Sequence, residues 1–577
     1  MKAEVASLQR RIRAGRGDAP ADLVLKRARV VNVFTGDIRV ADVAVQDGYV
    51  AGVQTGYAGR HELDADGRWV TPGLIDPHIH IESSMLMPAG LAAALAPHGT
   101  SAIVSDPHEI ANVLGMPGIR FLLDRSERLP VDVFFTAPSC VPATPLETSG
   151  ARLDADALVP LLKEPRILGL AEMMNFPGVC HSDAEVLEKL VRFQDRILDG
   201  HSPGLTGYDL QAYLAAGIQS DHECTTPEEA REKVAAGMFV MIREGTSARN
   251  LDALLPAVTM ENAGRFSFAS DDLHPQDLLR RGHLNHVVQR AIRAGLHPAL
   301  AVRLASFNPA SYFGLRNRGA VAPGFHADLV VLDDLDTFTV HRVYKNGKLV
   351  AEDGKLCASL EPEEGSTTAK PLATGPVTPD RFRILSRGTE ARAMELVPGQ
   401  ILTGQVLVHP RVLDGEVVSD PEQDLLKIAV VERHYGSGRT GLGLVRGFGL
   451  GAGALAGSVA HDSHNVIAVG VKDTDLARAV EEVRQMGGGL AVTRDGEVLA
   501  RVPLPVAGLL SDAPIRVLVD KIDEANRAAA LLGCGLEDPF MQLSFLALPV
   551  IPALKLTDRG LVDVVRFEHV PLFVSSG

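Results

Sequence analysis

Residues 71–80 read Thr-Pro-Gly-Leu-Ile-Asp-Pro-His-Ile-His, and this stretch decides the predicted fold class. His78 and His80 follow the apolar pair at 74–75, which favours a strand that runs up to the histidines. In a strand, residues two apart point to the same face, so both imidazoles can meet one metal ion. A His-x-His motif alone more often marks two histidines in a loop. This pair, however, ends the first strand of the segment in which strands begin to alternate with helices. Because barrel enzymes place their sites at the C-terminal ends of strands, the context favours metal ligands.

From residue 72 onward, apolar strands alternate with helices over roughly 240 residues, which predicts a (β/α)8 TIM-like barrel of the α/β class. The segment 226–237 is the best-marked helix, since Thr226 can cap it, Pro227 can begin it and Gly237 can end it. The expected strands lie at 100–105, 167–171, 197–200, 217–220, 238–242 and 265–269, and the other expected helices at 89–96 and 183–198.

Both flanks of this pattern have the short apolar runs and turn residues of a β-sheet. Residues 22–70 predict several strands, and residues 320–356 predict more, with Asn346-Gly347 as a hairpin turn. We expect the two flanks to pair into one small, split β-sandwich domain. The polar stretch 357–382 predicts a linker before an α+β domain. The expected boundaries are 1–71 and 319–365 for the small β domain, 72–318 for the barrel and 383–577 for the C-terminal domain.

Bulk properties exclude several classes of protein. A chain of 577 residues is too long for one core, so several domains are expected. The net charge of −15 argues against nucleic acid or an anionic membrane as a general partner. Five scattered cysteines without Cys-x-x-Cys spacing argue against disulfides and a thiolate metal site, and favour a cytoplasmic protein. The sequence shows no membrane span and no signal peptide, and residues 2–15 predict an exposed amphipathic helix.

Other predicted strand ends also carry metal-ligand types. Glu172, His201, His222 and Asp271 each follow an expected strand. Any one of them alone would more often be a capping or solvated residue, but together with His78 and His80 they form a set. Four imidazoles and two carboxylates suit two divalent ions, which would lower the pKa of a shared water. A nearby aspartate could take the water's proton, and the mixed donors are compatible with zinc, manganese or iron.

Several longer stretches carry a specific resemblance. Residues 70–84 (VTPGLIDPHIHIESS) and 319–334 (GAVAPGFHADLVVLDD) resemble the amidohydrolase superfamily, and within it the chain closely resembles the bacterial adenine deaminases. The resemblance covers nearly the whole chain, including 459–470 (VAHDSHNVIAVG) in the C-terminal domain. The other matching stretches are 105–112 (SDPHEIAN), 171–179 (AEMMNFPGV), 200–207 (GHSPGLTG), 220–225 (SDHECT), 243–248 (REGTSA) and 270–272 (SDD).

The resemblance implies hydrolysis of adenine to hypoxanthine and ammonia, in purine salvage, at a binuclear site. Manganese is the favoured metal, with iron or zinc as alternatives. Glu172 would bridge both ions, where many relatives use a carbamylated lysine, and Asp271 would also shuttle the proton. The implied ligands are His78, His80 and Asp271 for one ion and His201 and His222 for the other, while Glu82, Ser83, Asp106, His108, Glu109 and Glu244 are candidates for holding the purine.

Two other functions stay open at this point. One is a different amidohydrolase activity, such as that of a cyclic amidase or an amino-sugar deacetylase, because the metal site alone cannot separate these reactions. The other is a scaffold that has lost catalysis, which the complete ligand set disfavours. Apart from adenine, the only expected partner is a second copy of the chain in a homodimer. The triplet Asp462-Ser463-His464 is interpreted as a turn or a substrate-side contact, because adjacency in sequence is not the geometry of a catalytic triad.

Overall fold

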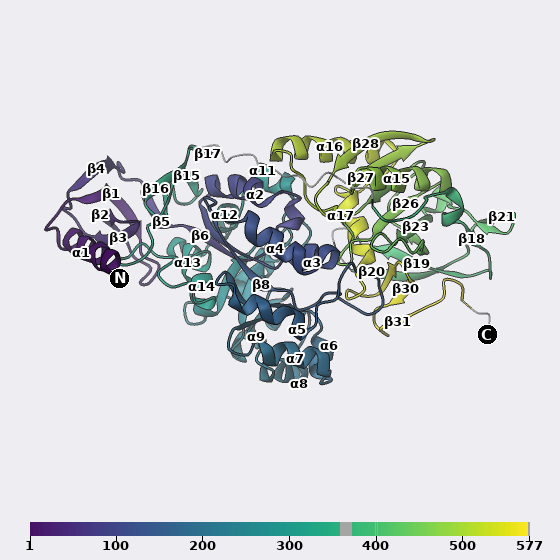
Figure 1. Cartoon of the computed structure of the whole chain (residues 1–577), viewed down its shortest axis with the longest axis horizontal. Helices are drawn as coiled ribbons and strands as arrows, with labels where there is room; N and C mark the ends of the chain where they lie inside the picture. Colours follow the sequence, from purple (N-terminus) through teal and green to yellow (C-terminus); the bar gives the residue numbers. More distant parts are fainter. Residues whose placement is uncertain (358–371, 398–399, 401, 575–577) are drawn as a thin grey trace.

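The computed structural model describes residues 1–357, 372–397, 400 and 402–574 of the chain. Three parts follow one another along the long axis of the molecule (Figure 1): a small β part at the N-terminal end, a central part of alternating strands and helices, and a C-terminal part rich in strands. The predicted linker at 357–382 falls mostly on residues 358–371, outside the described ranges.

The small β part is built from both flanks of the central part. Strand β5 (Trp69–Pro72) pairs antiparallel with β14 (Leu329–Asp334), which confirms the predicted pairing of the two flanks. Hydrogen bonding links all nine strands into one sheet. Helix α1 (Lys2–Arg16) packs against β2 and β3 and exposes most of its surface. The remaining strands are β1 (Ala21–Val31), β2 (Ile38–Gln46), β3 (Tyr49–Val53), β4 (Gly59–Asp64), β15 (Thr339–Lys345), β16 (Lys348–Glu352) and β17 (Lys355–Leu356).

The central part contains eight parallel strands in two hydrogen-bonded groups, which makes it barrel-like. At one junction between the groups, the Gln219 amide donates to the Leu198 carbonyl at 2.9 Å. At the other, the Asp271 amide donates to the His78 carbonyl at 2.9 Å, so the last strand lies beside the first. One group is β6 (Leu74–Ile79), β7 (Thr100–Ser105), β8 (Asp132–Ala137), β9 (Ile167–Met173) and β10 (Ile197–Gly200), and the other is β11 (Ser220–Asp221), β12 (Phe239–Arg243) and β13 (Phe266–Ala269).

These strands are buried along almost their whole length, as expected for parallel strands that helices cover on the outside. Helix α9 (Pro227–Ala235) begins as predicted, since the Thr226 hydroxyl accepts a hydrogen bond from the Glu229 amide at 3.3 Å. The other covering helices include α2 (Pro88–Leu95), α8 (Gly207–Ala215), α12 (Leu284–Arg293) and α13 (Pro298–Leu304).

The predicted helix at 183–198 is wrong in its second half. Helix α7 (Ala184–Arg192) begins after Asp183, whose carboxylate accepts from the Val186 amide, and it ends five residues before β10. Ile197 and Leu198 instead pair with β9. The apolar residues of a short buried strand continued the helical spacing by chance, so periodicity alone did not separate the two elements.

The C-terminal part is an eight-stranded sheet with helices against it. Helix α15 (Asp473–Gln485) packs on β25, β26 and β27, while α16 (Ile515–Leu531) lies against β28 and also against α2 and α11 (Pro275–Arg281) of the central part. The sheet contains β19 (Ala391–Leu396), β20 (Thr403–Val408), β23 (Leu426–Val431), β24 (Thr440–Arg446), β25 (Ala454–Gly457), β26 (Val466–Gly470), β27 (Gly489–Arg494) and β28 (Glu497–Pro503).

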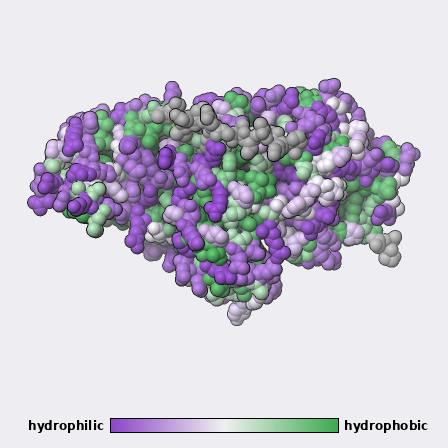
Figure 2. Space-filling view, viewed as in Figure 1, coloured by the Kyte–Doolittle hydropathy of each residue, from purple (hydrophilic) through white to green (hydrophobic). Residues whose placement is uncertain are grey.

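One hydrophobic core runs through the central and C-terminal parts. It includes Leu91 and Ile110 on one side and Val430 and Leu510 on the other. The Ser511 amide also donates to the Met85 carbonyl at 2.8 Å. The outer face in Figure 2 mixes many hydrophilic residues with smaller apolar patches. Within the described ranges, no helix combines the length and apolar character that a bilayer crossing requires.

Candidate metal centre

The six predicted ligands meet at one end of the parallel strands. His78 is in β6, with His80 directly after it, and Glu172 is in β9. The other three follow their strands within two residues: His201 after β10, His222 after β11 and Asp271 after β13. All are buried except His201, which is partly buried. The cluster therefore occupies the C-terminal strand ends, where barrel enzymes carry their sites.

The Glu172 carboxylate lies at the middle of the cluster and divides the four histidines into two pairs. Its Oε1 atom is 3.6 Å from His78 Nε2 and 3.4 Å from His80 Nε2. Its Oε2 atom is 2.8 Å from His201 Nδ1 and 3.1 Å from His222 Nε2. One carboxylate with an imidazole pair at each oxygen has the arrangement needed to bridge two cations.

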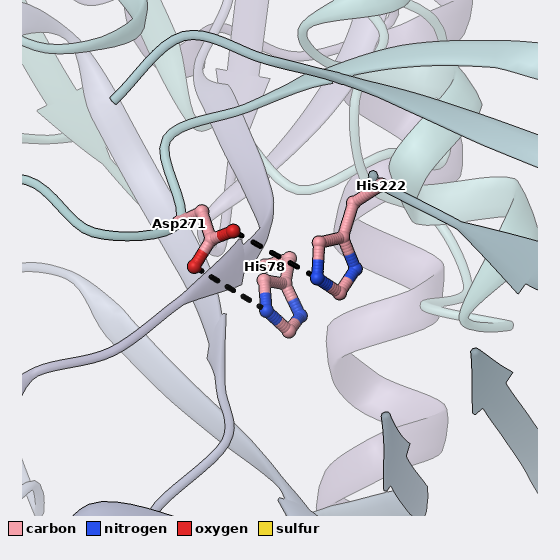
Figure 3. Close-up of side chains that lie close together, drawn as sticks. All are labelled: His78, His222 and Asp271. Carbon is pink, nitrogen blue, oxygen red and sulfur yellow. Dashed lines mark ion pairs between the residues drawn. The ribbon is translucent and has the colours of Figure 1, made fainter. Parts of the chain in front are cut away.

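Asp271 faces one histidine of each pair, His78 and His222 (Figure 3). Its Oδ1 atom is 3.2 Å from His80 Nε2 and 3.8 Å from His78 Nε2, and its Oδ2 atom is 3.7 Å from His222 Nε2. The backbone holds this residue in place, because its amide donates to the His78 carbonyl and its carbonyl accepts from the His80 amide. Its φ of +58° lies in the left-handed region, which Asp tolerates better than most residues.

The charges of the cluster favour positively charged occupants. Burial raises the pKa of Glu172, but the neighbouring His222 and His201 outweigh it and hold this pKa well below the ordinary value. Burial lowers the pKa of His222, yet Glu172 and Asp271 raise it to about 10. The same carboxylates that stabilise an imidazolium would stabilise a metal cation.

The donor atoms fit a divalent metal. His78 Nε2 is buried and has no hydrogen-bond partner among the described residues, so an electron pair is free to bind a cation. His80 Nδ1 lies 3.1 Å from the Asp106 carbonyl, which places the proton on Nδ1 and leaves Nε2 as the ligand atom. Three sets have all their ligand atoms within 4.8 Å of one another: His78, His80 and Glu172; Glu172, His201 and His222; and His78, His222 and Asp271.

Charged residues that the sequence did not single out surround this centre. Arg243, the last residue of β12, lies 2.6 Å from Asp271 Oδ2 and 2.8 Å from Asp272 Oδ2, and it also pairs with Glu223. Asp199 in β10 lies 3.8 Å from His78 Nδ1. Both positions end or precede the end of a strand, which is the signal that could have identified them.

Five of the six predicted purine-side residues gather beside the centre. The Ser83 hydroxyl donates to Asp272 Oδ1 at 2.6 Å, and His108 Nδ1 lies 2.9 Å from Asp106 Oδ2. Glu82 accepts from the Ile110 amide at 3.0 Å. Glu109 has its oxygens within 4.8 Å of the ligand atoms of His80 and His108.

The structure does not bring Glu244 to the same place. Its carboxylate pairs with Arg290 of α12 and accepts from the Leu251 amide at 3.2 Å. The side chain therefore holds helices together on the outer side of the strands, which follows from its position one residue after Arg243, since neighbouring strand residues point to opposite faces.

The C-terminal part also reaches the centre. His461 Nδ1 lies 3.3 Å from Glu109 Oε1, and Asp462 Oδ1 lies 3.8 Å from His108 Nε2. The sequence identified a substrate-side contact as one interpretation of Asp462, but it did not single out His461. The four polar residues at 461–464, next to the apolar β26, were the available signal.

A cavity of about 980 Å³ lies between the central and C-terminal parts. His201 and Glu223 line it from the side of the metal centre, while Asp538 and Met541 line it from the C-terminal part. Of the six proposed ligands, His201 lines this space, which is large enough for a small organic molecule.

Comparison with known proteins gives two family matches and close full-length relatives. Residues 69–350 match the amidohydrolase family, and residues 400–568 match the adenine deaminase C-terminal domain. The adenine deaminase of Desulfatibacillum aliphaticivorans is 53% identical over 97% of this chain and 99% of its own length. That of Methanothrix thermoacetophila is 49% identical over 98% and 99%, and that of Syntrophobacter fumaroxidans is 48% identical over the full length of both chains.

Proposed function

The chain belongs to the adenine deaminase family of amidohydrolases, and from that premise we propose that it hydrolyses adenine to hypoxanthine and ammonia. The observation that carries the proposal is the Glu172 carboxylate, which has His78 and His80 at one oxygen and His201 and His222 at the other, with His108 Nδ1 also 3.6 Å from the first. Two divalent ions held there by His78, His80, His201, His222, Glu172 and Asp271 would lower the pKa of a water molecule they share.

The residues around the centre have separate proposed tasks. Asp271 takes the proton from the attacking water and later delivers it to the departing amine. Arg243 lies 2.6 Å from Asp271 and keeps this carboxylate ionised between proton transfers, because burial raises its pKa but Arg243 and the histidines lower it further. Glu82, Ser83, Asp106, His108 and Glu109 bind the polar edge of the purine and exclude bulk water.

The finer features follow the same proposal. Nitrogen and oxygen donors without thiolate support manganese, with iron or zinc as alternatives. The hydrogen bonds at both junctions of the parallel strands support a closed (β/α)8 barrel over about residues 72–318, with the small β domain at 1–71 and 319–365 and the C-terminal domain at 383–577. We also propose that the protein is a homodimer and that it acts in purine salvage in the cytoplasm.

An adenine assay with defined metals tests the proposed function. The protein is stripped with a chelator, reloaded with manganese, iron or zinc, and mixed with adenine while hypoxanthine and ammonia are measured. We expect turnover only with metal, and about two ions per chain at full activity. Hydantoins serve as the comparison substrate. Turnover of a hydantoin without turnover of adenine under all three metals would replace the proposal by cyclic-amide hydrolysis.

A further inference from the structure

The connection between β25 and β26, residues 458–465, brings the C-terminal part to the metal centre. His461, Asp462, Ser463, His464 and Asn465 are all buried. Both ends of the connection are fixed: the Ser458 hydroxyl donates to the Gly508 carbonyl at 2.6 Å, and the side-chain Nδ2 of Asn465 donates to the Thr148 carbonyl at 2.8 Å. The side chains between them are therefore held at defined positions against the end of the barrel-like part.

Glu109 is the point where this connection meets the metal centre. It lies in the first turn of α3 (His108–Leu114), beside His80 and His108. Its Oε1 atom is 3.3 Å from His461 Nδ1 and 3.4 Å from the Ser83 hydroxyl, while its Oε2 atom is 3.9 Å from His464 Nε2. Two imidazoles from the C-terminal part thus face the two oxygens of one carboxylate.

This trio is grouped closely enough to hold a metal, but the hydrogen bonding of His464 disfavours that reading. His464 Nδ1 accepts from the Ala460 amide at 3.2 Å, so a neutral ring carries its proton on Nε2. That proton points toward Glu109 and occupies the position at which an ion would bind. Glu109 Oε2 and His464 Nε2 are both buried and lack a hydrogen-bond partner in the described part of the chain. Within the trio, His461 is therefore the imidazole that lies close enough to orient the Glu109 carboxylate.

We propose that His461 is a positioning residue that acts through Glu109: its Nδ1–H fixes the Glu109 carboxylate so that the second oxygen is presented to the purine. The inference rests on the proposed function and deepens it, because the C-terminal domain then completes the substrate site. Asp462 supports the same arrangement from beside His108, at 3.8 Å from its Nε2 atom. A carboxylate with one fixed donor loses little freedom when the substrate binds, which is why a buried partner of this kind contributes to turnover.

A packing role for His461 is the alternative, and two substitutions separate the roles. The His461 ring is stacked on Phe545, with centroids 4.6 Å apart and planes at 16°. His461→Phe keeps an aromatic ring for this stack but removes the donor. His461→Asn gives up the stack but places an amide N–H near the position of Nδ1. If the phenylalanine variant does not fold, His461→Leu takes its place, because leucine is close to asparagine in shape and has no donor.

The experiment measures kcat and KM for adenine, the Kd of hypoxanthine, and metal content for the intact protein and each variant. We expect His461→Phe to lower kcat/KM and weaken hypoxanthine binding, with a loss in kcat/KM of about 10–100-fold. Metal content should not change, and His461→Asn should recover most of the loss. The matched control is His409→Phe, at an exposed histidine of the same domain, which should behave like the intact protein.

The outcomes distinguish the inference from the proposed function. If the intact, metal-loaded protein does not turn over adenine, both the proposed function and the proposed role of His461 are wrong. If the intact protein is active and His461→Phe is equally active, only the role of His461 is wrong. The same conclusion follows if His461→Asn loses as much activity as the phenylalanine or leucine variant. Loss of metal in the His461 variants would also overturn it, because that result assigns His461 to the metal centre.

Discussion

At the residue scale, the Glu172 carboxylate lies within 3.6 Å of a ring nitrogen of all four histidines of the centre. Glu172→Gln removes the negative charge but keeps the shape. We expect the variant to bind substantially less metal, because the four imidazoles would then surround a neutral amide. Metal analysis after gentle purification checks this. A glutamine variant that retains both ions and the full rate would show that Glu172 does not bridge them.

At Asp271, we expect the same kind of substitution to lower the rate of turnover more than the metal content. Asp271→Asn leaves Glu172 and the histidines in place, so most of the metal should remain bound. Turnover should fall by about 10²–10⁴-fold, because an amide cannot carry the proton from water to the leaving amine. Steady-state kinetics and metal analysis of one preparation measure both effects. Equal losses of metal and rate would instead make Asp271 primarily a ligand.

The clustering of the six proposed ligands could be predicted from the sequence because each follows or ends a recognisable apolar strand. Arg243 also ends a strand and His461 begins a run of polar residues, but neither position by itself shows that the side chain reaches the centre. Arg243 belongs to the site only because β12 lies beside β13, and His461 only because the connection 458–465 of the C-terminal part packs onto the barrel-like part. Such contacts are set by tertiary packing, which leaves no local periodicity in the chain. Glu244 shows the opposite case, since it has a ligand-type side chain next to the site but points outward.

At the element scale, the segment between β8 and α5 (Ala155–Leu158) links the central part to the C-terminal part. Thr148 donates through its amide and its hydroxyl to the Asp558 carboxylate, at 2.8 and 2.7 Å. Glu147 beside it is buried, and its Oε1 atom accepts from the Thr144 amide at 3.3 Å. Burial, followed by the charge of Asp462, raises the pKa of Glu147 from 4.5 to about 8.

The raised pKa of Glu147 predicts how the free energy of unfolding varies with pH. Its folded-state pKa is raised, so folding favours the neutral acid, and the associated stability is present below pH 4.5 and is lost as pH rises toward 8. The glutamine in Glu147→Gln stays neutral at every pH. Between pH 5 and 8, the free energy of unfolding of this variant should therefore fall less than that of the intact protein, with a difference on the order of 1–4 kcal/mol. Thermal unfolding at several pH values measures the difference. Parallel pH profiles for the two proteins would mean that Glu147 titrates normally.

At the scale of the whole molecule, the shared hydrophobic core makes the C-terminal part a structural component of the barrel-like part. A chain that ends at residue 357 would expose Leu91, Ile110 and their neighbours to water. We expect this fragment to aggregate or to be recovered in much lower soluble yield, as size-exclusion chromatography would show. Removal of residues 1–16 is the control, because α1 exposes most of its surface. A monodisperse 1–357 fragment would show that the core divides at the boundary between the parts.

The pairing of β5 with β14 also determines when the protein can finish folding during its own synthesis. Trp69 leaves the ribosome early, but its partner Leu332 follows only after the entire central part has been translated. Until then, the edge of β5 has no neighbour on that side. Translation arrested before residue 329 should therefore yield a nascent chain that binds chaperones. A pause late enough for residues 329–356 to have left the ribosome should allow the small sheet to close before the C-terminal part is complete.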